Sequence, residues 1–98
     1  MTRGEGVAVD AAIQLQGEID IGNATEIGDM LCDELHRRPE IVVDLSGVTF
    51  IDSSGIAMMV RVDNYAGILR RTTTWRGARE ETLRLLNLTG VDRRLRLA

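Results

Sequence analysis

The sequence predicts one α/β domain in which helices pack on a small mixed sheet, in the order ββαβαβα(β). This prediction rests on three patterns: apolar alternation near the N-terminus, an amphipathic helical pattern over 23–38, and a nearly continuous apolar run at 41–45. A chain of 98 residues can bury one hydrophobic core but not two. We therefore expect residues 1–98 to form one domain with a four- to five-stranded sheet.

The first two strands are predicted from alternation with a period of two. Apolar side chains alternate over residues 7–9 and again over 13–16, as in strands with one face exposed to water. Residues 10–11 lie between these segments and would make a short turn. The chain is therefore expected to open with an antiparallel pair.

The first helix is predicted over residues 23–38, where the apolar period changes to three and four. Asn23 is suited to the N-cap, and Glu26 stands where a capping box requires an acid. Pro39 would end the helix. The apolar face would consist of Ala24, Ile27, Leu31 and Leu35.

A central strand is predicted at Ile41–Leu45, because its apolar side chains are mostly β-branched. The preceding helix would then be a right-handed crossover between parallel strands. Ser46-Gly47 would form a turn before a second extended stretch over 48–51. A second helix would follow Asp52, with Ile56 and Met59 on its apolar face, and Gly67 would close it.

The C-terminal third is predicted to be a strand, a helix and a short strand. Residues 72–75 have strand propensity, but Arg70 and Arg71 precede them, so an edge strand is expected. A third helix is expected over 78–88 with Leu83 and Leu86 facing inward and Leu85 as a further candidate. A last short strand is expected over 95–97.

Composition argues against several classes of function. Aromatic residues make up only 3% of the chain, too few for stacking on single-stranded nucleic acid. Residues 70–98 hold eight of the twelve basic residues, all arginine, but the net charge is −3, so we expect no direct nucleic-acid binding.

Cys32 and His36 are the only residues of their types, so no metal site and no cofactor are expected. Apolar runs are too short for a membrane span, and the first residues do not form a signal peptide, so a cytoplasmic protein is expected.

The segment that points to a function is Asp52-Ser53-Ser54-Gly55, where an extended stretch meets a predicted helix. The first turn of a helix has free backbone N–H groups and the positive end of the dipole, so it accommodates a phosphate attached to a serine there. Ser53 or Ser54 could also cap the unmodified helix, and Gly55 would let a partner's backbone approach. The structural alternative is that these residues are only a helix cap.

Residues 50–56 resemble the signature of STAS domains, and in particular of bacterial anti-sigma factor antagonists. Gly17–Asp20 resembles the family's Gly-Glu-Leu-Asp motif, and Leu88–Val91 resembles the end of its third helix. The resemblance covers about residues 7–92, in order and with matching spacing. It implies a STAS-like fold.

The resemblance implies a binding protein controlled by phosphorylation. Members of the family bind an anti-sigma factor that is also a serine kinase of the ATPase fold, and binding releases a sigma factor. The kinase phosphorylates the serine directly after the aspartate, here Ser53, with Ser54 as the second candidate, and a serine phosphatase reverses the modification. The residues expected to contact the partner are Asp20, Asp52, Ser54, Gly55 and Ile56. Asp20 and Asp52 would both lie at the carboxyl edge of the sheet if their strands are parallel neighbours. Turn and cap roles for the two aspartates, and a core role for Ile56, stay open.

Three other functions are weighed against this one. An enzyme is not expected, because no nucleophile-elbow motif surrounds Ser53 and His36 fits a solvated helix end. The same fold also serves as a subunit of lipid-transport ABC systems, in anion transporters and in stress-sensing complexes. A constitutive adaptor without phosphorylation is the remaining alternative. Two features depart from the family pattern: the arginines before the fourth strand, and a chain that stops before the family's terminal helix. The chain could also form a homo-oligomer.

Overall fold

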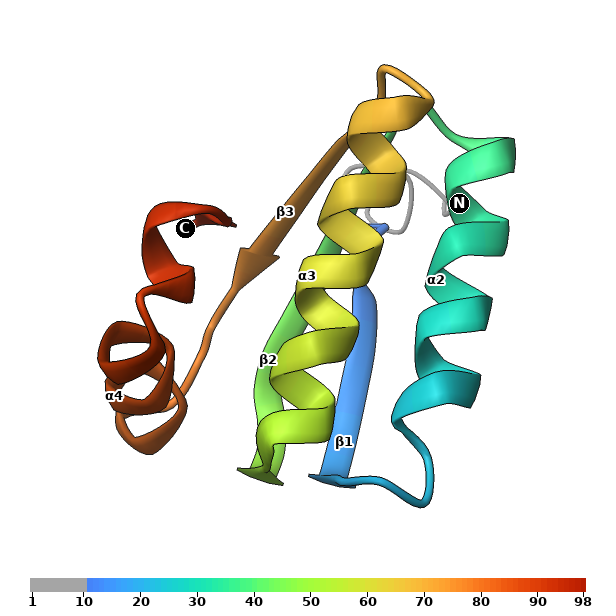
Figure 1. Ribbon diagram of the computed structural model, residues 1–98. Coiled ribbons are helices and arrows are strands. Elements are labelled where there is room, and N and C mark those ends of the chain that lie inside the picture. The colour runs from blue at the N-terminus through green and yellow to red at the C-terminus, as the bar shows by residue number, and fades with distance from the viewer. Residues whose placement is uncertain (1–10) are drawn as a thin grey trace.

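The computed structural model of the protein describes residues 11–98 and contains a four-stranded sheet with α-helices (Figure 1). The α/β fold is confirmed, with sheet order β1-β2-β3-β4 and all described pairs parallel. The predicted strand at 7–9 and its turn at Asp10 lie outside the described residues, so the antiparallel opening stays a prediction. The elements are β1 (Ile13–Ile19), α2 (Ala24–Arg37), β2 (Glu40–Ile51), α3 (Ser53–Ile68), β3 (Thr72–Arg76), α4 (Glu80–Thr89), a 3₁₀ turn (Val91–Arg93) and β4 (Arg96–Leu97).

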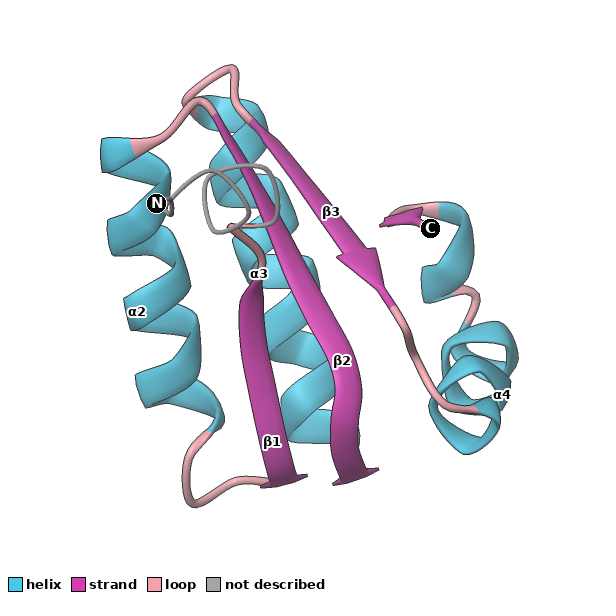
Figure 2. Ribbon diagram, turned by 180° about the vertical axis from the view of Figure 1, so that it is seen from behind, coloured by secondary structure: helices cyan, strands magenta, loops and turns pink. Residues whose placement is uncertain are grey.

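Helices α2 and α3 cover one face of the sheet, whereas α4 lies beside the sheet, beyond β3 (Figures 1 and 2). The apolar face of α2 follows the predicted spacing, and Ala24, Leu31 and Leu35 are buried. The carboxyl ends of β1 and β2 meet at one edge, from which α2 and α3 start (Figure 1). Ligands commonly bind outside this edge in open parallel sheets.

Strand β2 is one continuous strand, so the predicted turn at Ser46-Gly47 was wrong. Gln14 and Gln16 of β1 pair with Asp44 and Gly47 of β2, so β2 contains one extra residue at this point. A second register shift lies between Gly17 and Glu18. Bulges of this kind bend a strand without ending its pairing, which explains why the alternation along β2 breaks where a turn was expected.

Helix α3 ends in a Schellman motif with Arg70 in the left-handed conformation (φ 58°). The N–H of Arg71 donates to the Ala66 carbonyl at 2.7 Å, and the N–H of Arg70 donates to the Gly67 carbonyl at 3.1 Å. Gly67 lies within the helix and has no positive φ, so the prediction that it closes the helix was wrong.

Replacing Arg70 by glycine is expected to raise the free energy of unfolding by about 0.5–1 kcal/mol. An L-residue in the left-handed conformation is strained by about 1–2 kcal/mol, and glycine removes this strain. Glycine also has a larger conformational entropy in the unfolded chain, which cancels part of the stabilisation. Urea unfolding would measure the change, with Arg70→Ala as the matched control because it removes the same side chain but keeps Cβ. Equal stabilisation by both variants would show that side-chain loss, not backbone conformation, is responsible.

Strand β3 lies between β2 and the short β4, so the prediction of an edge strand was wrong for its second half. β4 pairs only with Thr74 and Trp75, and Thr72 and Thr73 have no strand on that side among the described residues. Thr73 and Trp75, which alternate with half-buried neighbours along β3, are both buried.

The predicted third helix is confirmed as α4, which begins two residues later than expected. Leu86 is buried as predicted. Leu83 is instead 44% exposed, and Thr82, one residue earlier, is buried in its place. The predicted last strand is confirmed as the two-residue β4.

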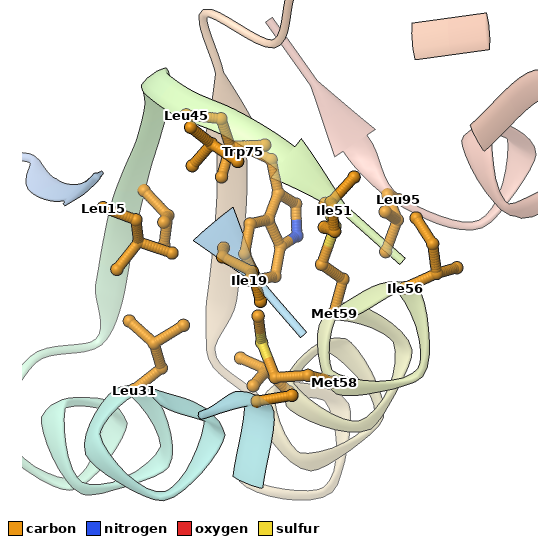
Figure 3. Close-up of a cluster of buried hydrophobic side chains, with 14 of the residues drawn as sticks. Leu15, Ile19, Leu31, Leu45, Ile51, Ile56, Met58, Met59, Trp75 and Leu95 are labelled. Carbon is orange, nitrogen blue, oxygen red and sulfur yellow. The ribbon is translucent and has the colours of Figure 1, made fainter. Parts of the chain in front are cut away.

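The core is aliphatic around one tryptophan (Figure 3). The side chain of Trp75 is fully buried, among residues contributed by β1, β2, α3 and the segment before β4. Ile19 and Ile51, the last residues of β1 and β2, belong to this core, so the strand ends that precede the site are fixed by packing.

Candidate functional site at the carboxyl edge

Asp20 and Asp52 follow the carboxyl ends of neighbouring parallel strands. Ile19 and Ile51 are paired, and the backbone N–H of Asp52 donates to the Ile19 carbonyl at 3.2 Å. The expectation that both aspartates lie at the same edge of the sheet is confirmed. The hydrogen bond joins the two loops directly.

The side chain of Asp52 caps α3. Its Oδ1 accepts hydrogen bonds from the N–H groups of Ser54 at 2.8 Å and Gly55 at 3.2 Å. Two of the free N–H groups at the helix start are thereby satisfied. The prediction that Ser53 or Ser54 caps the helix was wrong, because Asp52 already occupies the N-cap position.

Ser53 is the first residue of α3, and its side chain is exposed. Ser54 is partly buried and lines a hollow between the starts of α2 and α3. No hydrogen bond within residues 11–98 uses the hydroxyl of either serine. Ser53 therefore has an accessible hydroxyl at the positive end of a 16-residue helix.

Asp20 organises the loop between β1 and α2. Its Oδ1 accepts from the Gly22 N–H at 2.9 Å, and its carbonyl accepts from the N–H groups of Asn23 and Ala24. Asn23 does not cap α2 through its side chain. Its Oδ1 instead accepts from the Asp20 N–H at 3.0 Å, and its Nδ2 donates to the Glu18 carbonyl at 2.8 Å, so the predicted capping box is absent.

The two aspartates have the local roles that were left open, as turn and cap. Each uses Oδ1 for these contacts, and Oδ2 of each has no hydrogen-bond partner in the described part of the chain. Asp20 and Asp52 are both partly exposed. Each can therefore keep its structural role and still present one oxygen to a partner.

Gly55 and Ile56 face the core. A Cβ on Gly55 would overlap Ile51 Cγ1 and lie 3.0 Å from Ile19 Cγ2, so the absence of a side chain serves packing. The expectation that Gly55 provides room for a partner's backbone was wrong on this point. Ile56 is only 6% exposed, which fits the core role that was left open for it.

The hollow beside Ser54 has a volume of ≈ 270 Å³. Ile21, on its rim, is 83% exposed, which is unusual for an isoleucine. Arg61 also lines the hollow, and its hydrogen bond to Asp29 raises the pKa of the guanidinium. We call the exposed part of this region the carboxyl-edge surface. It consists of Asp20, Ile21, Thr25, Asp52, Ser53, Ser54 and Ala57.

Sequence reasoning missed Ile21, Thr25 and Ala57. Ile21 had a detectable signal, because an isoleucine stands between Asp20 and Gly22 in an otherwise polar loop. Thr25 and Ala57 have no such signal, since their exposure depends on how α2 packs beside α3.

Within residues 11–98, Ser53 has neither a histidine nor a metal-binding cluster beside it. His36 contacts Tyr65 Oη at 2.5 Å, near the C-terminal end of α2, whereas Ser53 is at the N-terminal start of α3. The described chain brings together no group of three His, Cys, Asp or Glu side chains that could hold a metal ion. No helix within residues 11–98 is both long and apolar enough to cross a bilayer.

Residues 5–97 match the family model described as "Mlab, STAS domain". A candidate anti-sigma factor antagonist of Thermotoga maritima has a similar structure, with a TM-score of 0.76 and 26% identity over 86% of this chain and 75% of that one. An anti-sigma factor antagonist of Mycobacterium paratuberculosis gives a TM-score of 0.75 and 28% identity over 86% and 72% of the two chains. The anti-sigma factor antagonist SpoIIAA, in its unphosphorylated form, shares the fold with a TM-score of 0.66 and 14% identity over 87% and 74%.

Proposed function

The chain belongs to the STAS domain family, and we propose from this premise that it is an anti-sigma factor antagonist switched off by phosphorylation of Ser53. In this proposal the carboxyl-edge surface binds an anti-sigma factor that is also a serine kinase of the ATPase fold, and binding releases a sigma factor. A serine phosphatase restores the binding form. The structural relatives from Thermotoga maritima and Mycobacterium paratuberculosis support the general role of antagonist.

The observation that carries the proposal is the exposed hydroxyl of Ser53 beside the cap formed by Asp52. A kinase can reach this hydroxyl without unfolding the helix, because Asp52 and not Ser53 satisfies the first N–H groups. The helix dipole accommodates the added charge of about −1.5 to −2. Ser53 is thus suited to be a substrate of another enzyme, and the protein itself is proposed to be a binding protein and no enzyme.

The carboxyl-edge surface has the composition of a small docking site. Ile21 supplies exposed apolar area, and Asp20 and Asp52 each offer one free oxygen to a basic partner. Phosphate on Ser53 would add negative charge to the surface that already holds these aspartates, and burying it against an imperfect match is costly. The proposed switch therefore acts at the interface and not through a change of fold.

Phosphorylation is tested by mass spectrometry after incubation with extract of the native host and Mg-ATP. The expected result is the gain of one phosphoryl group on Ser53, which is lost in Ser53→Ala and retained in Ser54→Ala. A gain on Ser54 alone would keep the mechanism and change the residue. No gain, with the kinase active on another substrate in the same extract, would contradict this switch and favour a transport subunit or a constitutive adaptor.

A further inference from the structure

A hollow of ≈ 250 Å³ lies between the second half of α3 and the outer edge of β3. It opens there because β4 pairs with β3 only at Thr74 and Trp75 and leaves the start of β3 uncovered. We call it the arginine hollow. Its lining includes Asp63, Gly67, Arg71, Thr73, Arg94 and Arg96.

Positive charge dominates the arginine hollow. Three arginines from different elements converge on it, and Asp63 is the one acid among the lining residues. Arg94 is held in place by its hydrogen bond to Asn64 Oδ1 at 3.1 Å. The guanidinium groups of Arg71 and Arg96 form no hydrogen bond or salt bridge with the described residues, so they are available to a ligand.

Asp63 does not neutralise this charge. Burial raises the pKa of its carboxyl, and the attraction of Arg94 and Arg96 opposes that effect. No salt bridge joins Asp63 to either arginine within residues 11–98. The hollow therefore keeps a net positive charge when all four groups are ionised.

Thr73 is a second feature of the arginine hollow, independent of the arginines. Its side chain is 2% exposed and lines the hollow, yet its Oγ1 has no hydrogen-bond partner in the described structure. Buried hydroxyl groups are almost always hydrogen-bonded, because an unsatisfied one is costly. This oxygen is itself buried, so a ligand oxygen would satisfy it only after the side chains that line the hollow move aside.

We propose that the arginine hollow binds a phosphate-class oxyanion, either inorganic phosphate or a phosphate monoester. Guanidinium groups match the oxygens of phosphate in charge and geometry, and the Thr73 hydroxyl supplies a further donor. The site is separate from the carboxyl-edge surface, since Asp63 lies about 15 Å along α3 from Ser53. The proposal therefore stands whether or not Ser53 is a phosphoacceptor.

The test is a phosphate titration of the full chain at constant ionic strength, followed by calorimetry and by the amide NMR signals of residues 71–73. Arg96→Gln is expected to weaken phosphate binding about tenfold, because one charge-assisted contact is lost. The matched control is Arg93→Gln, which removes an exposed arginine that does not line the hollow and is expected to change affinity less than about twofold. Equal weakening by both variants would show a diffuse charge effect and would overturn the site.

Thr73→Val separates a ligand role from a packing role. It removes the hydroxyl at nearly constant volume, so the variant should melt at a higher temperature without phosphate and gain less from phosphate than the parent. Asp63→Asn should bind phosphate more tightly, because it removes repulsion. An unchanged phosphate titration in Thr73→Val would contradict the proposed contact.

The source of the phosphate group is decided by comparing probes. Glycerol phosphate tests a free monoester, and vesicles of phosphatidylcholine with and without phosphatidic acid test a lipid headgroup. Binding of either probe that is weakened by Arg96→Gln supports the site and identifies its source. Binding of neither, together with no response to inorganic phosphate, would overturn the proposal.

Discussion

Phosphorylation of Ser53 is expected to weaken binding to the anti-sigma factor more than a hundredfold. A loss of this size corresponds to roughly 3 kcal/mol of binding free energy. The cost arises because a group with a charge of about −1.5 to −2 must be desolvated at an interface that already holds Asp20 and Asp52. Ser53→Asp adds less charge and no tetrahedral group, so a loss of about tenfold is expected for that variant. Calorimetric titration against the anti-sigma factor identified by the phosphorylation experiment would measure both values.

Two controls separate an interface effect from a folding effect. Gln14→Glu adds one negative charge on an exposed residue of β1, away from the carboxyl-edge surface, and should leave binding nearly unchanged. The free energy of unfolding of the phosphorylated protein should differ from that of the parent by less than about 1 kcal/mol, since the helix start tolerates negative charge. Unchanged affinity after complete phosphorylation would refute the proposed switch.

Gly55→Ala is expected to lower the free energy of unfolding by about 2–3 kcal/mol, because it overpacks the core. The new Cβ would overlap Ile51 Cγ1, lie 2.8 Å from Ile51 Cδ1 and come within 3.0 Å of Ile19 Cγ2. These atoms belong to the strand ends that precede Asp20 and Asp52. Chemical unfolding would give the stability change.

Gly67→Ala is the matched control in the same helix. A Cβ at position 67 meets nothing within 4 Å, so alanine should stabilise α3 by up to about 1 kcal/mol through its helix propensity. Opposite signs for the two substitutions would establish that Gly55 is required for packing and Gly67 is not. Destabilisation by Gly67→Ala would contradict the expectation that position 67 has room for a side chain.

The sequence predicted the helices and strands well where an apolar pattern continues over many residues. The amphipathic spacing of α2 and the apolar run at the start of β2 each lie within one segment, and burial of these apolar side chains stabilises the element that the pattern predicts. Predictions failed where the outcome depends on another segment. The extra residue near Ser46 is accommodated by pairing with β1, and the exposure of Leu83 depends on where α4 lies beside the sheet.

The candidate site was predicted in its location more securely than in its details. Asp20 and Asp52 were placed at one edge by topology alone, since the ends of parallel neighbours must meet there. Which side chain caps α3 could not be decided, because aspartate and serine are both good caps. The packing of Gly55 against the core could not be predicted either, because it depends on the positions of the Ile19 and Ile51 side chains.

The cap formed by Asp52 has a consequence for how this surface can change in evolution. Because the Asp52 side chain accepts from the N–H groups of Ser54 and Gly55, neither of these two hydrogen bonds at the helix start depends on the side chain at position 53. A gene copy could therefore exchange Ser53 for a residue that accepts no phosphate and still encode a folded domain. Under the proposed function, loss of regulation would then require one substitution, and the copy would keep its fold and its binding surface.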